Sequence, residues 1–134
     1  MNKKLLIAIV DDDLIFQFIA ERLIESINSE HQTIIFSDGK EAIDFIDSNR
    51  NELDTLPDII FLDINMPVMN GWQFLNKYIE IKSEIKKEIT IYIVSSSKNP
   101  DDFIKAENIN EVTDYIVKPI NREKYTSILD SFCK

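Results

Sequence analysis

The segment Pro57-Asp-Ile-Ile-Phe-Leu-Asp-Ile-Asn-Met-Pro-Val-Met-Asn-Gly71 decides the fold of this chain. Its apolar run from Ile59 to Leu62 ends at a single carboxylate, Asp63, and Pro67 interrupts the chain soon afterwards. A short apolar run bounded by prolines is typical of a strand that is buried on both faces of a sheet. Parallel α/β sheets carry their chemistry at the carboxyl ends of such strands. Taken alone, Asp63 is explained more simply as the residue that ends a strand and begins a turn.

The composition is that of an acidic globular chain. Its 134 residues are enough for one domain with a core and too few for two. A formal net charge of -9 argues against nucleic-acid binding, which needs positive charge toward the phosphates. The single cysteine, Cys133, provides no disulfide framework and fits a reducing compartment. The run Leu5–Val10 is too short for a signal peptide, and no segment has membrane-spanning length. We therefore expect a cytoplasmic protein without membrane association.

Four more apolar runs share the character of the first, and each run is followed by a segment with helical spacing. In chain order the runs are Leu5–Val10, Thr33–Phe36, Ile59–Leu62, Ile89–Val94 and Val112–Val117. Alternation of strand and helix predicts a parallel sheet with helices on both faces, which explains why the strands are apolar throughout. The predicted fold is a doubly wound, flavodoxin-like (βα)5 domain of the α/β class, with strand order 2-1-3-4-5.

Local signals predict the helices and the turns between them. The first helix should have Asp13 as its cap and a buried stripe made of Phe16, Ile19, Ala20, Leu23, Ile24 and Ile27. The pair Asn99-Pro100 is a strong start signal for the fourth helix, which has few apolar residues to bury. Asp38-Gly39 is interpreted as a turn that closes the second strand. The one histidine, His31, is interpreted as a surface residue at the beginning of that strand.

Polar side chains stand at the carboxyl ends of four of the predicted strands. In chain order they are an acid pair, an acid, a hydroxyl and a lysine: Asp11 and Asp12, Asp63, Ser95, and Lys118. Each has an ordinary structural explanation, because acids begin helices, serines form turns and a lysine before proline is usually solvated. Since the carboxyl ends of a parallel sheet lie at one edge, the four positions together predict a single site.

Three carboxylates with a lysine indicate a magnesium-dependent phosphoryl site. Carboxylates packed together repel one another unless a cation intervenes, and oxygen ligands without histidine or cysteine favour Mg²⁺ over zinc. The charges of Asp11, Asp12 and Asp63 would be balanced by Mg²⁺ and Lys118. One carboxylate can act as nucleophile on phosphorus, while the metal, the ammonium and the Ser95 hydroxyl hold the transferring oxygens.

With these residues the chain resembles the response regulator receiver domains, the phosphoacceptor modules of two-component signalling, from about Lys4 to Phe132. The matching pieces are Ile9-Val-Asp-Asp12, Phe61-Leu-Asp-Ile-Asn-Met-Pro67 with Gly71, Ile93-Val-Ser-Ser96, and Asp114-Tyr-Ile-Val-Lys-Pro119. Together they are highly specific, whereas any one alone would be weak. The resemblance implies a single receiver domain over residues 4–132 with no output domain, and Mg²⁺ as its cofactor.

The resemblance also implies a role for each residue of the acidic cluster. Asp63 would be the phosphorylated residue. Asp12 and Asp63 would bind Mg²⁺ directly, Asp11 would do so largely through water, and Asn65 would contribute its backbone carbonyl.

A conformational switch is implied as well. Ser95 would take the position of the switch hydroxyl, which is often threonine in this family, and Lys118 would pair with the phosphoryl group. Tyr115 would be the aromatic residue whose ring turns inward when Ser95 moves, although a half-buried strand tyrosine explains this position almost equally well. The Lys118–Pro119 peptide would be cis. Because serine lacks one methyl group of packing, a looser switch is expected. The turn before Tyr115 also lacks the glycines common in the family.

The expected function is that of a stand-alone receiver. It would accept a phosphoryl group from a phosphohistidine of a histidine kinase or histidine phosphotransfer protein. Its output would be a change in the surface of the fourth helix, fifth strand and fifth helix, which would bind a downstream protein. A relay intermediate or phosphate sink is an alternative with the same chemistry.

Two other classes of protein fit the sequence less well. An aspartyl-phosphate phosphatase of the haloacid dehalogenase type resembles this site, but its Asp-x-Asp motif lies on the first strand. Here Asp63-Ile-Asn65 lies on the third strand and lacks the second acid, which serves as general acid–base in turnover. No enzyme activity beyond self-phosphorylation and autodephosphorylation is therefore expected. A pseudo-receiver scaffold is disfavoured, because the complete set of site residues is present.

Overall fold

The computed structural model describes residues 4–132, in which strands and helices alternate as predicted. The strands are β1 (Leu6–Val10), β2 (Gln32–Phe36), β3 (Ile59–Leu62), β4 (Thr90–Ser95) and β5 (Val112–Val117). The helices are α1 (Leu14–Ile27), α2 (Gly39–Ser48), α3 (Gly71–Ile81), α4 (Pro100–Glu107) and α5 (Arg122–Asp130), with a 3₁₀ turn, η1 (Lys82–Glu84), after α3. Cys133 lies outside the described residues.

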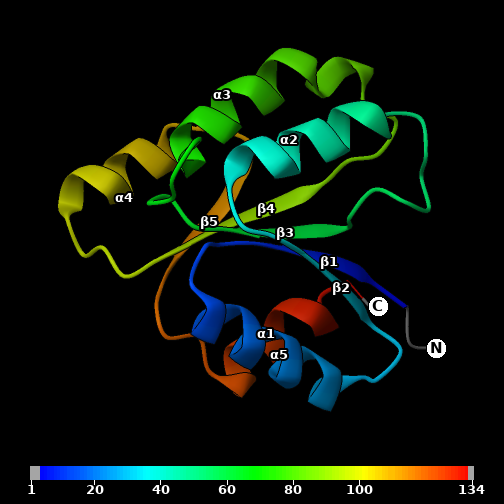
Figure 1. Ribbon diagram of the computed structural model, residues 1–134. Coiled ribbons are helices and arrows are strands. Elements are labelled where there is room, and N and C mark those ends of the chain that lie inside the picture. Colours follow the sequence, from blue (N-terminus) through cyan, green and yellow to red (C-terminus); the bar gives the residue numbers. More distant parts are fainter. Residues whose placement is uncertain (1–3, 133–134) are drawn as a thin grey trace.

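The strands form one parallel sheet in the order β2-β1-β3-β4-β5, which confirms the predicted flavodoxin-like topology. Helices α1 and α5 cover one face of the sheet, and α2, α3 and α4 lie on the other (Figure 1). None of the helices in the described range is both long enough and apolar enough to cross a bilayer.

Two hydrophobic cores lie on opposite faces of the sheet, and the alternation of side chains along each strand divides the apolar residues between them. Ala8, Val10, Ile60 and Leu62 belong to the core beneath α2 and α3. Their neighbours in the chain, Ile7, Ile9, Ile59 and Phe61, belong to the core beneath α1 and α5. The central strands are therefore apolar at every position because both of their faces are covered by helices.

The buried face of α1 differs from the predicted stripe. Gln17, Ala20 and Ile24 are buried, whereas Ile19 is 48% exposed. At 3.6 residues per turn Ile19 lies about 100° around the helix from Ala20, outside the sector that faces the sheet. The prediction for Ile19 was wrong because spacing alone does not show how wide the covered sector is.

His31 is buried, and its interpretation as a surface residue was wrong. Its Nδ1 atom accepts a hydrogen bond of 3.1 Å from the backbone N–H of Leu5. This bond gives a partner to a buried amide that lies just before β1, and an unpaired amide there would be costly. Burial lowers the pKa of the His31 imidazole, because the charged form is poorly solvated at this position.

The helix caps follow the local sequence signals. Asp13 caps α1 and Asn99 caps α4, as predicted. Asp38 is a cap as well, because its carboxylate accepts from the backbone N–H of Glu41 at 2.9 Å. The pair Asp38-Gly39 therefore begins α2 and does not form an independent turn.

Candidate functional site

Two neighbouring strands bring the central carboxylates together. Val10 of β1 is paired with Leu62 of β3, so the next residues along the two strands, Asp11 and Asp63, emerge side by side at the edge of the sheet. The backbone N–H of Asp63 donates to the carbonyl of Val10 at 2.9 Å, which continues the ladder by one step. One carboxylate oxygen from each of Asp11, Asp12 and Asp63 lies within 4.8 Å of the other two.

Burial dominates the electrostatics of this cluster. Asp11 is 1% exposed and Asp63 is 7% exposed, whereas Asp12 lies at the surface. Burial, followed by the charge of Asp11, raises the pKa of the Asp63 carboxyl from 3.8 to about 6. Burial also raises the pKa of Asp11, although Lys118 acts in the opposite direction. Lys118 therefore stabilises the negative charges of Asp11 and Asp63 only in part.

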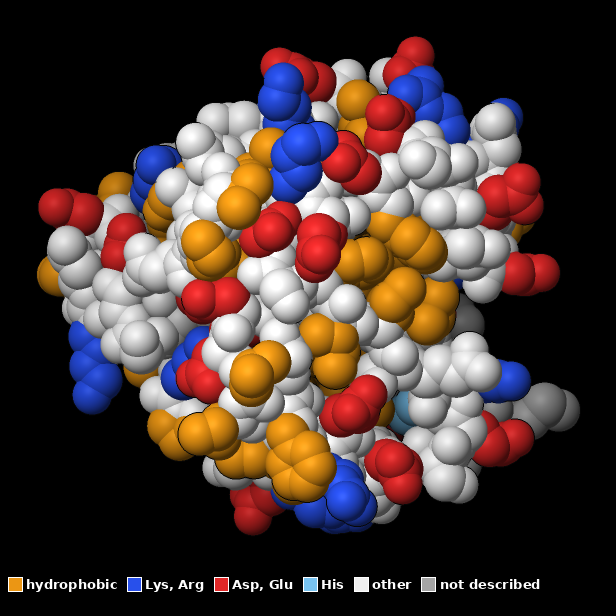
Figure 2. Space-filling model, viewed as in Figure 1, with side chains coloured by type: hydrophobic (Ala, Val, Ile, Leu, Met, Phe, Trp, Pro, Cys, Tyr) orange, Lys and Arg blue, Asp and Glu red, His pale blue; other side chains and the backbone are white. Residues whose placement is uncertain are grey.

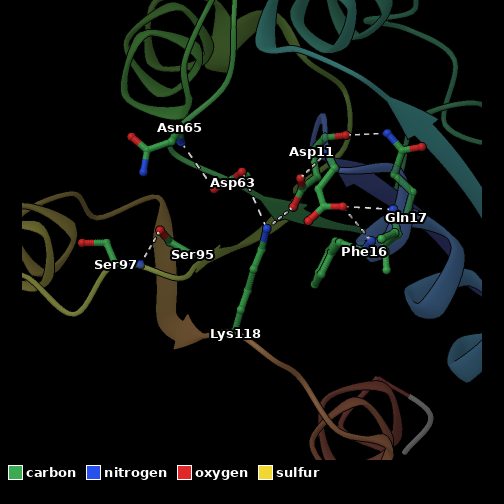
Figure 3. A network of polar contacts seen from close by, with 10 residues as sticks. Asp11, Phe16, Gln17, Asp63, Asn65, Ser95, Ser97 and Lys118 are labelled. Atoms are coloured by element: carbon green, nitrogen blue, oxygen red, sulfur yellow. Dashed lines mark hydrogen bonds and ion pairs between the residues drawn. The ribbon is translucent and has the colours of Figure 1, made fainter.

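Lys118 reaches the carboxylates from the end of β5 (Figure 3). Its Nζ atom lies 2.7 Å from Asp11 Oδ2 and 3.7 Å from Asp63 Oδ2. The ammonium also lies 4.4 Å from the centre of the Phe16 ring. The Lys118–Pro119 peptide is cis, as predicted.

Ser95 ends β4 next to this cluster, and its side chain is completely buried. Its hydroxyl oxygen accepts a hydrogen bond of 3.1 Å from the backbone N–H of Ser97. The Ser97 carbonyl in turn accepts from the Tyr115 hydroxyl at 2.9 Å, and the Ser97 hydroxyl donates to Asp102 of α4 at 2.6 Å. Ser97 thus connects the site hydroxyl to both Tyr115 and α4.

The loop after Asp63 is held close to the start of α3. The backbone N–H of Asn65 donates to Asp63 Oδ1 at 3.3 Å, and the N–H of Gly71 donates to the Ile64 carbonyl at 3.1 Å. A Cβ atom at Gly71 would lie 2.5 Å from the Asp63 carbonyl oxygen. Only glycine fits this approach, so Gly71 fixes the backbone that carries Asp63.

Two polar residues of the site escaped the sequence analysis. Gln17 is buried in α1, and its Nε2 atom donates to the backbone carbonyl of Asp11 at 2.6 Å. Ser97 follows Ser95 and Ser96 in a run of three hydroxyl residues and was given no role in the predicted site. A polar residue at a buried position of a helical stripe is the signal that could have pointed to Gln17, whereas nothing in the local sequence distinguishes Ser97 from Ser96.

The donor set of the cluster fits a hard divalent cation. Asp11, Asp12 and Asp63 offer carboxylate oxygens, which is the ligand type that Mg²⁺ and Mn²⁺ accept. A cation among them would favour the charged form of Asp63, whose pKa is raised first by burial and then by the charge of Asp11.

Comparison with known proteins agrees with this arrangement. The family model for the response regulator receiver domain matches residues 7–130. The chain belongs to the response regulator receiver family. Receiver domains are signalling modules that interact with histidine kinases and with downstream targets.

Relatives of this receiver come from different organisms. The crystal structure of a two-component response regulator from Cytophaga hutchinsonii has a TM-score of 0.84 at 26% identity, and the match covers 96% of this chain and 97% of that chain. The two-component response regulator 24 of Arabidopsis thaliana is 29% identical over 128 residues, which are 96% of this chain and 84% of that protein. The Mn²⁺-bound form of response regulator Rcp1 has a TM-score of 0.66 at 26% identity, with 96% of this chain and 91% of that chain covered.

The structure of this receiver brings most of the predicted site residues into one place. The Lys118 ammonium forms ion pairs with Asp11 and, at a longer distance, with Asp63. Asp12 lies beside these two acids. Ser95 lies on β4, the strand next to the Asp63 strand. The Tyr115 ring packs against Phe103 of α4, with ring centres 4.3 Å apart, and its hydroxyl donates to the Ser97 carbonyl.

Proposed function

We propose that this receiver accepts a phosphoryl group on Asp63 from a phosphohistidine of a histidine kinase or histidine phosphotransfer protein. The observation that carries the proposal is the position of Asp63, a nearly buried carboxylate within 4.8 Å of two other acids and 3.7 Å from a lysine ammonium. In the transfer, an Asp63 carboxylate oxygen forms a bond to phosphorus. The bond between phosphorus and the imidazole nitrogen breaks, and the nitrogen keeps the electron pair.

Each site residue has a part in this transfer. Asp11, Asp12, Asp63 and the Asn65 backbone carbonyl would hold Mg²⁺, which supplies positive charge for the phosphoryl oxygens. Rcp1, a related response regulator, is known in an Mn²⁺-bound form. Lys118 lies close enough to move from Asp11 toward a phosphoryl oxygen on Asp63.

The output is proposed to pass through β4 and α4. A phosphoryl group on Asp63 offers new acceptor oxygens, and the Ser95 hydroxyl is the donor at the end of the adjacent strand. Turning that hydroxyl toward the phosphoryl group breaks its bond with the Ser97 N–H. Ser97 also binds Tyr115 and Asp102, so its displacement would alter the surface of α4, β5 and α5 on which a downstream protein docks. A phosphorelay intermediate would use the same site without this output.

The phosphodonor is proposed to dock on α1. Four apolar residues of this helix are exposed, Leu14, Ile15, Phe18 and Ile19, with exposed fractions of 48% to 73%. They contribute to the apolar side chains that gather over α1 in the lower part of Figure 2. Since α1 begins three residues after Asp11, a protein seated on this patch would lie next to the phosphoacceptor.

The test of the proposed function is incubation of the protein with Mg²⁺ and acetyl phosphate, followed by measurement of its intact mass. The parent should gain one phosphoryl group, and the Asp63→Asn variant should gain none. The Asp54→Asn variant is a matched control, because Asp54 is an exposed loop residue near Leu5 and Leu6, at the opposite end of β1 from Asp11. Equal labelling of Asp63→Asn and the parent would remove Asp63 as the acceptor.

A further inference from the structure

Phe16 lies against the site ammonium without belonging to the predicted set of site residues. We propose that Phe16 is a positioning residue whose ring face holds the Lys118 ammonium at Asp11, and that this contact sets the rate at which Asp63 is phosphorylated. The inference rests on the proposed phosphoacceptor function, and its test includes a measurement that does not depend on phosphorylation.

Four residues form a closed circuit of contacts at the start of α1 (Figure 3). The backbone N–H of Asp13 donates to Asp11 Oδ1 at 2.9 Å, and Asp13 Oδ1 accepts from the backbone N–H of Phe16 at 3.2 Å. The Phe16 ring faces the Lys118 ammonium at 4.4 Å, and that ammonium returns to Asp11 Oδ2 at 2.7 Å. The cap that begins the helix therefore also fixes the backbone of the residue whose ring meets the lysine.

The ring contact has electrostatic weight because the ammonium is poorly solvated. The Lys118 side chain is 16% exposed and Asp11 is 1% exposed. An ammonium over an aromatic face is attracted by the ring quadrupole, and this attraction strengthens as water is removed. Lysine carries its charge on a flexible four-carbon stem. The Phe16 ring and Asp11 together therefore restrict the position of the Lys118 ammonium more than Asp11 could alone.

In the unphosphorylated structure, the contact with Phe16 accompanies a particular position of the Lys118 ammonium. The ammonium is 1 Å nearer to Asp11 Oδ2, at 2.7 Å, than to Asp63 Oδ2, at 3.7 Å. An ammonium held there leaves the Asp63 oxygen free to attack phosphorus and needs only a short movement to meet the transferred group. Without the ring, the lysine can turn to solvent or settle on the attacking oxygen, and both positions slow the transfer.

The rate experiment compares residues at position 16 that differ in their ring. With acetyl phosphate and saturating Mg²⁺, Phe16→Leu should be phosphorylated about 5-fold more slowly, whereas Phe16→Tyr and Phe16→Trp should stay within about 2-fold of the parent. Replacing Phe16 with progressively fluorinated phenylalanines keeps its shape and weakens the ring quadrupole, so the rate should fall stepwise with fluorine number. Phe45→Leu is the control, because Phe45 is a partly buried aromatic residue of α2 outside the site.

The second measurement uses the unphosphorylated protein without metal. A proton at the face of an aromatic ring resonates upfield, so the Lys118 ε-methylene protons should be shifted upfield in the parent and in Phe16→Tyr but not in Phe16→Leu. Absence of this shift from the parent would overturn the contact itself. A shift that is present, together with rates indifferent to fluorination, would reduce Phe16 to packing and overturn the positioning role. If the parent shows the shift but takes no phosphoryl group, the phosphoacceptor function fails and the rate claim falls with it.

Discussion

Two parts of the molecule border the site, and they differ in burial: β3 with the loop after Leu62 on one side, and β5 with α4 on the other. All residues of β3 are buried, and Asp63 follows it on a loop that packs against Gly71. On the other side, β5 buries Ile116 alone and α4 buries Ala106 alone, in a part of the chain that the structure describes in full. The pairing of β4 with β5 also contains a register shift, between Ile91 and Tyr92.

This difference matches the two tasks proposed for the domain. The acids that would bind metal need a fixed geometry, because small displacements weaken coordination and phosphoryl transfer. The elements proposed to carry the signal need two arrangements that are close in free energy, so a phosphoryl group or a partner can select between them. Few buried contacts at α4 and β5 make such a second arrangement inexpensive.

The largest expected effect comes from a change at Gly71, against which the loop after β3 packs. A Gly71→Ala substitution places a Cβ atom 2.5 Å from the Asp63 carbonyl oxygen and 2.8 Å from Ile64 Cα, and both of these neighbours are backbone atoms. The loop has to shift, so we expect a loss of about 3 kcal/mol in the free energy of unfolding and a strongly reduced phosphorylation rate. Denaturant unfolding measures the first effect. Asn76→Ala, on the exposed face of α3, is the control, and equal stability of the two variants would contradict the close approach.

The second effect is a pH dependence that originates on the same side. A carboxyl pKa raised from 3.8 to about 6 means that the folded state binds the Asp63 proton more tightly than the unfolded chain does. Without metal, the contribution of Asp63 to stability should therefore rise by about 2 kcal/mol as the pH falls from above 6 to below 4.

The contribution of Asp63 can be isolated by comparison with the Asp63→Asn variant. His31 works in the opposite direction, because burial lowers its pKa and its protonation at low pH favours unfolding. Both proteins contain His31, so the difference between their stability curves removes its effect. The gap in unfolding free energy between Asp63→Asn and the parent should narrow at low pH, where Asp63 is neutral in the parent. Parallel curves from pH 7 to 4 would show that Asp63 titrates normally.

The sequence predicted local features of the chain better than features that depend on distant partners. The apolar strands and the caps Asp13 and Asn99 follow from local patterns, and the order of the strands follows from the fold that the alternation of strand and helix predicts. The roles of His31 and Ser97 depend on partners far along the chain, Leu5 and Tyr115, which no local pattern identifies. Ile19 shows the same limit, because exposure depends on how much of a helix its neighbours cover.

The third prediction tests whether the two sides are coupled through Ser95. Ser95→Ala removes the proposed donor to the phosphoryl group, yet Asp63 and the other acids remain. Phosphorylation should stay measurable, while the change that beryllofluoride induces in amide exchange over residues 99–118 should be lost. The measurement is hydrogen exchange of parent and variant, each with and without beryllofluoride and Mg²⁺. The same induced change in both proteins would exclude the hydroxyl as the link.

The smallest expected effect lies on the less buried side of the site, at the hydrogen bond between Ser97 and Asp102 of α4. Ser97→Ala removes a donor that is 2.6 Å from the Asp102 carboxylate, but it keeps the Ser97 carbonyl that binds Tyr115. The substitution also removes the acceptor of the Asn99 backbone N–H, which lies 3.2 Å from Ser97 Oγ, but this N–H is exposed and can bind water instead. Asp102 still lies in the first turn of α4, where a negative charge is favourable, so the main loss is the tether between α4 and the preceding loop.

Loss of this tether should cost about 1 kcal/mol, which is the usual net contribution of one such bond. Amide exchange in Pro100–Glu107 should accelerate by about 5-fold. Exchange in β3 should stay unchanged, because every residue of that strand is buried and the tether joins Ser97 to α4. The matched control is Ser96→Ala, which removes an exposed hydroxyl from the neighbouring position. If Ser97→Ala and Ser96→Ala exchange alike in α4, the helix is held by its packing on Ala106 and not by Ser97. A loosened α4 with unchanged β3 would place the mobility of this receiver on one side of its site.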